Sequence, residues 1–408
     1  MPVTDADVVI VGGGAAGLSL AYRLCAPAQG PRRPSVIVVD APSGPNSPPE
    51  RTWCYWEAPG GPYDSVLAAS WQQLRVRGRD GAVISGLPAP LRYKMLRSRA
   101  FEALVDERLS GPDGCRRVAA TVDSVTDTPE GAEVSGYTSS GRRVGLRARW
   151  VFDSRPPKRL PPARTTLLQH FRGWFVRTDQ PAFDPRVADL MDFRTPQPAR
   201  GLSFGYLLPL GPCEALVEYT EFSPAVLRTD DYDHALRGYT EDILGLGAFE
   251  IAAVEQGVIP MTDGRFPRRA GDSVFRIGTA GGATRPSTGY TFAAIQRQAA
   301  AVSQALLQHR DPLPPPPHSA RSRTMDAVML RALDSGRMDG ADFFTQLFRE
   351  VPTEGLLRFL DGRSRIREDF LIGLSTPVIP MLRALAELPF LRRRPAPRGP
   401  AEGPPAAP

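Results

Sequence analysis

A glycine-rich turn close to the N-terminus constrains the fold of this 408-residue chain more than any other feature. Gly12, Gly14 and Gly17 follow the apolar run DVVIVG and open the helix-compatible segment AAGLSLAYRL, which leads into a second apolar run, SVIVVD. The pattern predicts a strand, a helix and a second parallel strand. In such a unit the first glycine permits the tight turn, the second lets a pyrophosphate approach the backbone, and the third lets the helix pack on the strand. We therefore predict a dinucleotide-binding Rossmann unit over residues 7–40.

Asp40 closes the second predicted strand, 23 residues after Gly17 (40 − 17). An acidic residue at this position can accept hydrogen bonds from the ribose hydroxyls of an adenosine. The N-terminus of the preceding helix offers unpaired N–H groups and a partial positive charge to the pyrophosphate. A glycine turn without a ligand is the alternative, but the strand, the helix and the terminal aspartate all favour nucleotide binding.

A second glycine-rich turn, GTAGGATRPSTGYTF, spans residues 278–292 and precedes a predicted helix over 293–307. A late turn of this kind is how large FAD folds meet the middle of the cofactor, whereas NAD domains usually lack it, so the sequence favours FAD. The candidate cofactor-binding residues are Gly12, Gly14, Gly17, Asp40, Gly278, Gly281, Gly282, Pro286, Thr288 and Gly289.

The segments between and after the two glycine turns differ in character. Residues 164–275 hold short alternating runs rich in aromatic residues, such as LSFGYLLPL and EALVEYTEF, which predict an antiparallel sheet. Residues 318–392 follow a proline-rich linker and have a helical pattern. We predict an α/β protein with a discontinuous Rossmann-type FAD domain (5–163 and 276–310), an inserted antiparallel-sheet substrate domain (164–275), a C-terminal helical region (318–392) and a disordered tail (393–408).

The composition limits which binding partners and which cellular compartment we expect for this chain. A net charge of +6 is a modest excess, and the chain lacks the aromatic-interleaved basic stripe that predicts nucleic-acid binding. No apolar run of about 20 residues predicts a membrane span, and we expect no signal peptide before the first strand. The cysteines and histidines are scattered, so we expect no disulfide framework, no metal site and a reducing cytosol. They are Cys25, Cys54, Cys115, Cys213, His170, His234, His309 and His318.

Several segments are more specific than the glycine loop. The order GGGAAGL, RTWCYW, FDSRP, QHFRGW, YLLPL…ALVEYT and GTAGGATRPSTGY resembles the flavin-dependent lycopene β-cyclase family of carotenoid biosynthesis, over residues 7–390. The resemblance implies reduced FAD, with NAD(P)H as the expected electron donor, and an isomerase that converts lycopene to γ- or β-carotene without net redox change. It also implies a linear ψ-ended carotene dissolved in the membrane as substrate, and a cytoplasmic protein peripherally associated with that membrane.

Glu218 is the candidate catalytic acid. Within LPLGPCEALVEYT it matches the family's essential glutamate, although Tyr219 stands where many members have a second acid. Closing a β ring requires one proton to be added to the polyene and another to be removed, and a carboxylic acid can deliver a proton if burial raises its pKa. Strand alternation places Glu218 on one face with Leu216 and Thr220, and the fallback acid Glu221 on the other. An exposed strand carboxylate or an arginine partner is the structural alternative.

The carbocation formed during ring closure needs stabilisation without a nucleophile, which aromatic faces and an electron-rich reduced flavin supply. The candidate pocket residues, each alternatively a member of the ordinary core, are Trp53, Tyr55, Trp56, Trp174, Tyr206 and Tyr290. The last helical segment combines an apolar face with Arg383 and the Arg392–Arg394 cluster. This segment suits docking on an anionic lipid surface, or equally packing on the body of the protein.

Two other functions use the same glycine turns. An FAD monooxygenase or a prenyl-chain reductase would share the fold but would not need a strand acid. A non-catalytic flavin-binding module would need neither a sealed apolar pocket nor Glu218. Arg97 and Arg99 are the two candidates for the arginine that commonly follows the third strand of such folds.

Overall fold

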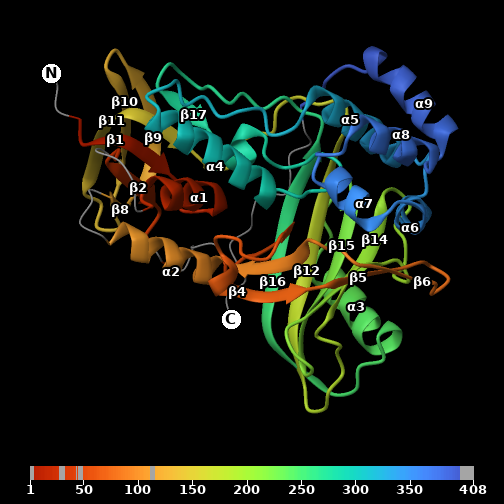
Figure 1. Ribbon diagram of the computed structural model, residues 1–408. Coiled ribbons are helices and arrows are strands. Elements are labelled where there is room, and N and C mark those ends of the chain that lie inside the picture. Colours follow the sequence, from red (N-terminus) through yellow and green to blue (C-terminus); the bar gives the residue numbers. More distant parts are fainter. Residues whose placement is uncertain (1–3, 27–32, 43, 45–48, 111–114, 396–408) are drawn as a thin grey trace.

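The computed structural model describes residues 4–26, 33–42, 44, 49–110 and 115–395. Within these residues the strands form two seven-stranded sheets and one three-stranded sheet. Figure 1 shows the first large sheet with its helices on the left, the long second sheet on the right, and the C-terminal helices over the upper end of the second sheet.

The first sheet is the nucleotide-binding type of sheet that the glycine loop predicts. Its strands are β1 (Ala6–Val11), β2 (Val36–Asp40), β8 (Cys115–Ala119), β9 (Thr121–Thr128), β10 (Gly131–Tyr137), β11 (Arg143–Asp153) and β17 (Val274–Arg276). The order is β8-β2-β1-β11-β10-β9, and β17 also pairs with β11. The pairs β8–β2, β2–β1, β1–β11 and β11–β17 are parallel. The pairs β9–β10 and β10–β11 are antiparallel. The valines and isoleucine of β1 and β2 are buried on both faces, as expected of central parallel strands.

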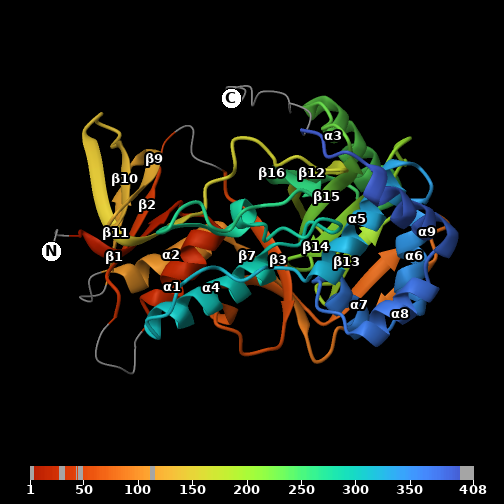
Figure 2. The ribbon, with the colours of Figure 1, turned by 90° about the horizontal axis from the view of Figure 1, so that it is seen from above.

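Three helices accompany this sheet: α1 (Ala15–Leu24), α2 (Ser98–Leu109) and α4 (Phe292–Leu307). Figure 2 shows α1 and α4 side by side, and their apolar residues share one buried core with α2. Cys25 at the end of α1 and Cys115 in β8 form a disulfide, whereas Cys54 and Cys213 are free. The sequence predicted no disulfide framework but did not foresee this single pair, which forms because the fold places two cysteines 90 residues apart next to each other.

The second sheet confirms the antiparallel prediction for residues 164–275. Its strands are β5 (Gln73–Arg77), β6 (Val83–Gly86), β12 (Thr166–Thr178), β13 (Val187–Asp192), β14 (Leu202–Pro209), β15 (Glu214–Ser223) and β16 (Phe249–Thr262). The order is β16-β12-β15-β14-β13-β5-β6, and only the β13–β5 pair is parallel among these described strands. Residues 73–86, which fall within the range expected for the FAD domain, extend this second sheet instead.

A small sheet connects the two large ones. It consists of β3 (Thr52–Glu57), β7 (Arg92–Arg97) and β4 (Leu67–Trp71), which follows the short helix η1 (Asp64–Val66). In Figure 2, β3 and β7 lie between α4 and the second sheet. Alternate residues of β3 enter different cores: Trp53 and Tyr55 pack in the first domain, and Cys54 and Trp56 pack against the core of the second sheet.

The remaining helices cover the two faces of the second sheet. One face carries α3 (Thr229–Arg237) and the π-helical turn η2 (Gly238–Ile243). The other carries the C-terminal helices α5 (Ala320–Asp334), α6 (Gly340–Glu350), α7 (Thr353–Leu360), α8 (Ile366–Leu374), α9 (Val378–Glu387) and the short η4 (Leu388–Phe390). Arg394, in the segment expected to be a disordered tail, pairs with Ala163 through two backbone hydrogen bonds. Residues 396–408 of that tail lie outside the described residues.

In the part of the chain that the structure describes, no single helix has the length and apolarity needed to cross a bilayer. The segments Ile366–Leu374 and Val378–Phe390, bent by 115° at their junction, meet the criteria of length and composition only when taken together.

A buried ion pair joins the second glycine turn to the C-terminal helices. Arg285 and Asp326 are each 1% exposed, and the Arg285 Nε donates to Asp326 Oδ1 over 3.0 Å. We expect Asp326→Ala to lower the free energy of unfolding by about 3–5 kcal/mol, because it leaves a buried guanidinium without its counter-charge. Asp311→Ala breaks an exposed ion pair with Arg269 and should lower the free energy of unfolding by less than about 1 kcal/mol. Urea denaturation followed by tryptophan fluorescence compares the stabilities of the two variants. Equal losses of unfolding free energy would contradict a stabilising role of the buried Arg285–Asp326 pair.

Candidate functional site

The first glycine loop has three distinct environments. Gly12 has a φ of +99°, which side-chain-bearing residues rarely adopt. A Cβ at Gly17 would lie 1.9 Å from the carbonyl oxygen of Gly12, so only glycine lets α1 approach β1 this closely. At Gly14, the N-cap residue of α1, no atom lies within 4 Å of the Cβ position. The loop therefore combines a tight turn, a close helix–strand contact and an open approach to the helix N-terminus.

Asp40 lies at the end of β2, directly beside this loop. A Cβ placed on Gly13 would lie 2.2 Å from Asp40 Oδ2. Arg117 Nη2 donates to the same oxygen over 3.2 Å and also forms ion pairs with Glu102 and Asp106. The carboxylate is thus held at the position expected for a ribose contact, by an arginine that the sequence analysis did not single out.

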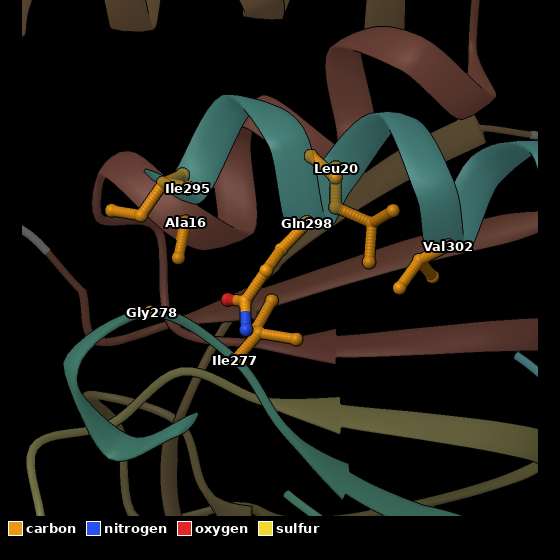
Figure 3. A pocket seen from close by; sticks show the side chains of 8 residues that line it. Ala16, Leu20, Ile277, Gly278, Ile295, Gln298 and Val302 are labelled. Atoms are coloured by element: carbon orange, nitrogen blue, oxygen red, sulfur yellow. The ribbon is translucent and has the colours of Figure 1, made fainter. Parts of the chain in front are cut away.

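The second glycine turn contacts the first. It begins with the 3-10 helix η3 (Gly278–Gly281), and a Cβ at Gly278 would lie 2.7 Å from the Cβ of Ala16 in α1. Beside this contact, α1, α4 and the turn enclose a cavity of about 10 Å³, into which Gln298 points (Figure 3). A cavity of this size holds at most one water molecule. The two glycine segments therefore lie directly against each other at the start of α1.

The other predicted residues of the second turn have mixed roles. Gly282 and Gly289 have φ angles of +79° and +71°, so both need glycine for the backbone path. A Cβ at Gly281 would lie 2.4 Å from the carbonyl oxygen of Arg276, which closes the turn tightly. Thr288 donates its hydroxyl to the carbonyl of Leu360 over 3.1 Å, so its side chain fastens the turn to the end of α7. Pro286 is half-buried within the same turn.

Gln169 of β12 is a site residue that the sequence analysis missed, although its segment QHFRGW was noted. A Cβ at Gly289 would lie 1.9 Å from Gln169 Oε1, so this oxygen faces the second glycine turn. Gln169 Oε1 is buried and has no hydrogen-bond partner among the residues that the structure describes. Buried polar atoms of this kind normally have a partner. An unpaired acceptor beside the turn, together with the open approach at Gly14, fits the binding of a flavin dinucleotide that runs along both glycine segments.

Glu218 lies in β15, in register with Gly173 of β12 and Tyr206 of β14. Its side chain is buried, with 9% exposed, and Thr220 Oγ1 donates to Glu218 Oε1 over 2.6 Å. Burial raises the pKa of Glu218 to about 8; the Thr220 hydrogen bond opposes this shift, and the nearby Glu255 carboxyl adds to it. The expected alternation is observed, since Leu216 belongs to the core under the C-terminal helices and Tyr219 to the core on the opposite face.

A connected set of aromatic side chains and one thiol lies beside this carboxyl, with Tyr206 and Cys54 interacting with it directly. The rings of Trp56 and Tyr290 have centroids 4.6 Å apart, and the hydroxyls of Tyr93 and Tyr206 form a hydrogen bond. The Cys54 thiol interacts with Glu218 and Tyr206, and burial raises its pKa to about 12, so it stays neutral. Here the set Glu218, Cys54, Trp56, Tyr93, Tyr206 and Tyr290 is named the Glu218 site. Tyr290 directly follows Gly289, which places this set next to the second glycine turn.

Three of the predicted pocket residues do not belong to the Glu218 site. Trp53 stacks on Phe292 with ring centroids 5.7 Å apart, and Tyr55 lies 4.7 Å from the same ring. Both are on the opposite face of β3 from Cys54 and Trp56. Trp174 faces the core with α3. The structure therefore does not bring these three residues to Glu218, because successive strand residues point to opposite faces, a rule that already divides RTWCYW into two sets.

Glu255 of β16 is a second buried carboxyl near Glu218 that the sequence analysis missed. It is 5% exposed and accepts hydrogen bonds from the Thr52 backbone N–H (2.7 Å) and hydroxyl (2.5 Å). Burial raises the pKa of Glu255, while Thr52, Arg97 and Arg51 oppose the shift. The fallback acid Glu221 lies on the opposite face, where it accepts from the Tyr219 hydroxyl.

Of the two candidate arginines, Arg97 is the one that reaches this region. Its Nη2 donates to Glu50 over 2.7 Å, and its guanidinium lies 4.1 Å above the ring of Phe175 in β12. Arg99 belongs to α2 and does not enter the Glu218 site. Arg97 therefore brings a positive charge to the Glu255 side of the second sheet.

Valine substitutions at Gly14 and Gly17 should have opposite effects on flavin binding and stability. Gly14→Val should abolish flavin binding and leave the thermal midpoint of the flavin-free protein unchanged, because no protein atom opposes the new side chain and the φ of −82° suits valine. Gly17→Val should lower that midpoint, since its Cβ collides with a backbone oxygen. Flavin absorbance after gel filtration and thermal denaturation of the flavin-free proteins give the two measurements. Full flavin retention by Gly14→Val would rule out this loop as the nucleotide site.

Solved structures share the fold at low sequence identity. The p-nitrophenol 4-monooxygenase PnpA from Pseudomonas putida DLL-E4 is 18% identical with a TM-score of 0.61, and the match covers 95% of this chain and 98% of that chain. A geranylgeranyl bacteriochlorophyll reductase-like protein from Thermoplasma acidophilum is 14% identical with a TM-score of 0.57, over 94% of this chain and 96% of that chain. The myxobacterial chondrochloren halogenase CndH, described as a variant of FAD-dependent halogenases, is 13% identical with a TM-score of 0.54. The match covers 94% of this chain and 96% of that chain. These similarities confirm the predicted α/β fold with its C-terminal helices.

No curated protein sequence gives a significant match to this chain. The sequence profile of one family, described as "Lycopene cyclase protein", matches residues 7–386, which is nearly the whole chain. The profile match covers both glycine turns, the Glu218 strand and the C-terminal helices. The chain therefore belongs to the lycopene cyclase family.

Proposed function

We propose that this protein is a lycopene β-cyclase in which Glu218 is the catalytic acid. The observation that carries the proposal is a carboxyl group buried among aromatic side chains next to the second glycine turn, with its pKa raised to about 8. At neutral pH such a group is mostly protonated, and a protonated carboxyl is what the first step of a cyclisation needs. Family membership supports the substrate class, a linear carotene with ψ ends.

The proposed reaction moves protons without changing the oxidation state of the carotene. Glu218 gives its proton to the terminal double bond of the polyene, and the resulting tertiary cation is attacked by a second double bond, which closes the ring. Loss of a different proton from the ring then forms the new double bond. The product is an isomer of the substrate, and the catalytic carboxyl regains a proton from the one released or from solvent.

The chain's own residues supply a setting in which the cation can survive. The rings of Trp56, Tyr93 and Tyr290 present aromatic faces, which stabilise a cation without bonding to it. Cys54, the strongest potential nucleophile of the Glu218 site, is kept as a neutral thiol by burial. Exclusion of water by these packed side chains protects the cation from hydration.

The cofactor proposed for this site is FAD in its reduced form, with NAD(P)H as the electron donor. Gly12, Gly14 and Asp40 would hold the adenosine and pyrophosphate, and the second glycine turn with Gln169 would hold the isoalloxazine end. When bound, reduced flavin supplies an electron-rich, anionic ring that stabilises positive charge electrostatically. Such a role explains why a reaction without net redox change would use a redox cofactor.

Glu218→Gln tests the acid directly. We expect this variant to fold, to bind FAD and to lose at least about 100-fold of the cyclisation rate, since an amide cannot donate the proton. Glu221→Gln is the matched control, because Glu221 is a buried glutamate of the same strand on the opposite face and should leave the rate nearly unchanged. Pigment analysis of lycopene-accumulating cells and FAD content of the purified proteins provide the readouts. Normal ring formation by Glu218→Gln would overturn the assignment.

The redox alternatives are tested in the same preparation. A monooxygenase or a prenyl-chain reductase consumes NAD(P)H in proportion to the product, whereas a cyclase needs it only to reduce the flavin once. NAD(P)H consumption that rises with each equivalent of lycopene, together with an oxygenated or hydrogenated product, would replace the cyclase proposal.

We further propose that helices α8 and α9 dock the protein on a lipid surface. Their outer faces carry large exposed apolar side chains, among them Ile366 (76%), Phe370 (67%) and Ile379 (64%). Arg365, Arg367 and Arg383 are exposed on the same helices and can contact anionic headgroups. Arg393, expected to belong to the basic end, instead donates to the Pro162 and Asp263 carbonyls and pairs with the Asp263 carboxylate. Docking at this surface would place the protein at the membrane where lycopene is dissolved, on the cytoplasmic side.

Serine substitutions on this surface test the docking proposal. We expect Phe370→Ser/Leu374→Ser/Ile379→Ser to reduce sedimentation with vesicles of anionic phospholipid by at least tenfold, because each change removes apolar area available for insertion. The control is Tyr137→Ser/Leu307→Ser, which alters exposed apolar residues of β10 and α4 in the domain of the first sheet. Equal vesicle binding by both variants would exclude α8 and α9 as the docking surface.

A further inference from the structure

Two buried glutamates flank one glycine in the second sheet, and their arrangement has a consequence for proton transfer. We propose that Glu255 is the positioning residue that keeps Glu218 in its proton-donating form, by carrying a negative charge on the same face of the sheet, two strands away. This inference rests on the proposed function of Glu218 as the acid. It assigns a role to a residue outside every motif on which the family resemblance was based.

The register of three neighbouring strands sets the geometry. Gly173 of β12 lies opposite Glu218 in β15 on one side and opposite Glu255 in β16 on the other. Partners in register share a face, and adjacent strands are about 4.8 Å apart, so the two glutamate Cα atoms are separated by roughly 10 Å. A Cβ at Gly173 would lie 3.4 Å from the Cβ of Glu218 and 2.8 Å from the side chain of Leu216. Because Gly173 has no side chain, the middle-strand position in register with both glutamates carries no side chain on their shared face.

The surroundings of the two carboxyls determine which one is charged. Glu255 accepts two hydrogen bonds from Thr52, and the charges of Arg97 and Arg51 act on it. Burial raises the pKa of Glu255, and these donors and cations oppose the shift and favour the ionised form.

Glu218 has the opposite environment. Thr220 donates one hydrogen bond to it, and the titratable groups that face it from the packed strands are Tyr206 of β14, Cys54 of β3 and Glu255 of β16. Burial keeps the tyrosine and the thiol neutral, so no cation offsets the cost of ionising Glu218. The proton of the pair therefore resides on Glu218 and the negative charge on Glu255. Two carboxyls whose environments separate their pKa values in this way commonly divide acid and charged roles between them.

Glu255 also connects the two sheets at the site. Thr52, which donates both hydrogen bonds, is the first residue of β3, and Cys54 and Trp56 follow on the same face of that strand. A charged Glu255 therefore holds the edge of the Glu218 site in place while it disfavours ionisation of Glu218. The two effects can be separated, because glutamine retains the shape and can still accept from the Thr52 N–H but carries no charge.

The test uses the purified full-length holoenzyme and the variants Glu255→Gln and Glu255→Asp. Removing the charge should lower the pKa of Glu218, so the proton is lost at a lower pH. The pH at which cyclisation falls to half should therefore move down by roughly one unit in Glu255→Gln, the size expected for two charges about 10 Å apart at an effective dielectric constant of about 20. Glu255→Asp retains the charge and should stay closer to the wild-type profile, in which activity declines as the pH rises through about 8.

A second readout does not depend on catalysis. The infrared carbonyl band of a protonated carboxylic acid can be titrated with pH, and the part of the band that disappears in Glu218→Gln belongs to Glu218. Its midpoint should move to lower pH in Glu255→Gln by the same amount as the activity profile. Glu221→Gln serves as the control, because it removes a buried carboxyl from the opposite face and should leave the Glu218 midpoint in place.

The outcomes distinguish this inference from the proposed function. If the wild-type protein forms rings and Glu255→Gln leaves both midpoints unchanged while retaining FAD, Glu255 has no electrostatic role and the inference is overturned. If the infrared midpoint shifts but the wild-type protein forms no ring from lycopene, the acid pair stands and the cyclase proposal fails. A loss of activity at all pH values with an unchanged infrared midpoint would reduce Glu255 to an anchor for β3 and would also overturn the inference.

Discussion

Removal of one carboxyl group from water is the constraint on which the proposed chemistry depends. Glu218 lies on the inner face of the second sheet, enclosed by β3, β14 and the second glycine turn, and has no cationic partner in the described part of the chain. Most buried carboxylates in proteins are stabilised by an arginine or by several donors. Burial without such a partner raises the pKa of this group to about 8, which makes it an acid at neutral pH. The neighbouring aromatic rings and the neutral Cys54 suit the cation that proton transfer would create.

The rest of the fold brings this carboxyl to the nucleotide-binding sheet. Strand β3 connects the two large sheets, with alternate residues entering each core, and the Thr52–Glu255 hydrogen bonds fasten it to the second sheet. The second glycine turn is held from the other side, through Arg285 to α5 and through Thr288 to the end of α7. Helix α5 and the end of α7 therefore stabilise the turn beside the Glu218 site. Helices α8 and α9 expose an apolar surface.

Local patterns predicted much of this structure. Strong periodicity and glycine spacing located β1, α1, β2, the second turn and α4, because these segments are specified by neighbours in the sequence. Alternation in EALVEYTEF correctly separated Glu218 from Glu221. The same rule, if applied to RTWCYW, would have removed Trp53 and Tyr55 from the pocket.

The features that sequence reasoning missed depend on pairing between distant segments. The Cys25–Cys115 disulfide, the contact of Gln169 with Gly289, and the alignment of Glu255 with Glu218 across Gly173 all depend on how distant segments pair. The most direct test of the central claim is cyclisation of lycopene by the purified protein in heavy water, with mass analysis of the product. Because the Glu218 carboxyl exchanges its proton with solvent before the substrate binds, acid catalysis predicts one deuterium in each ring formed. Rings that form without deuterium would contradict the account.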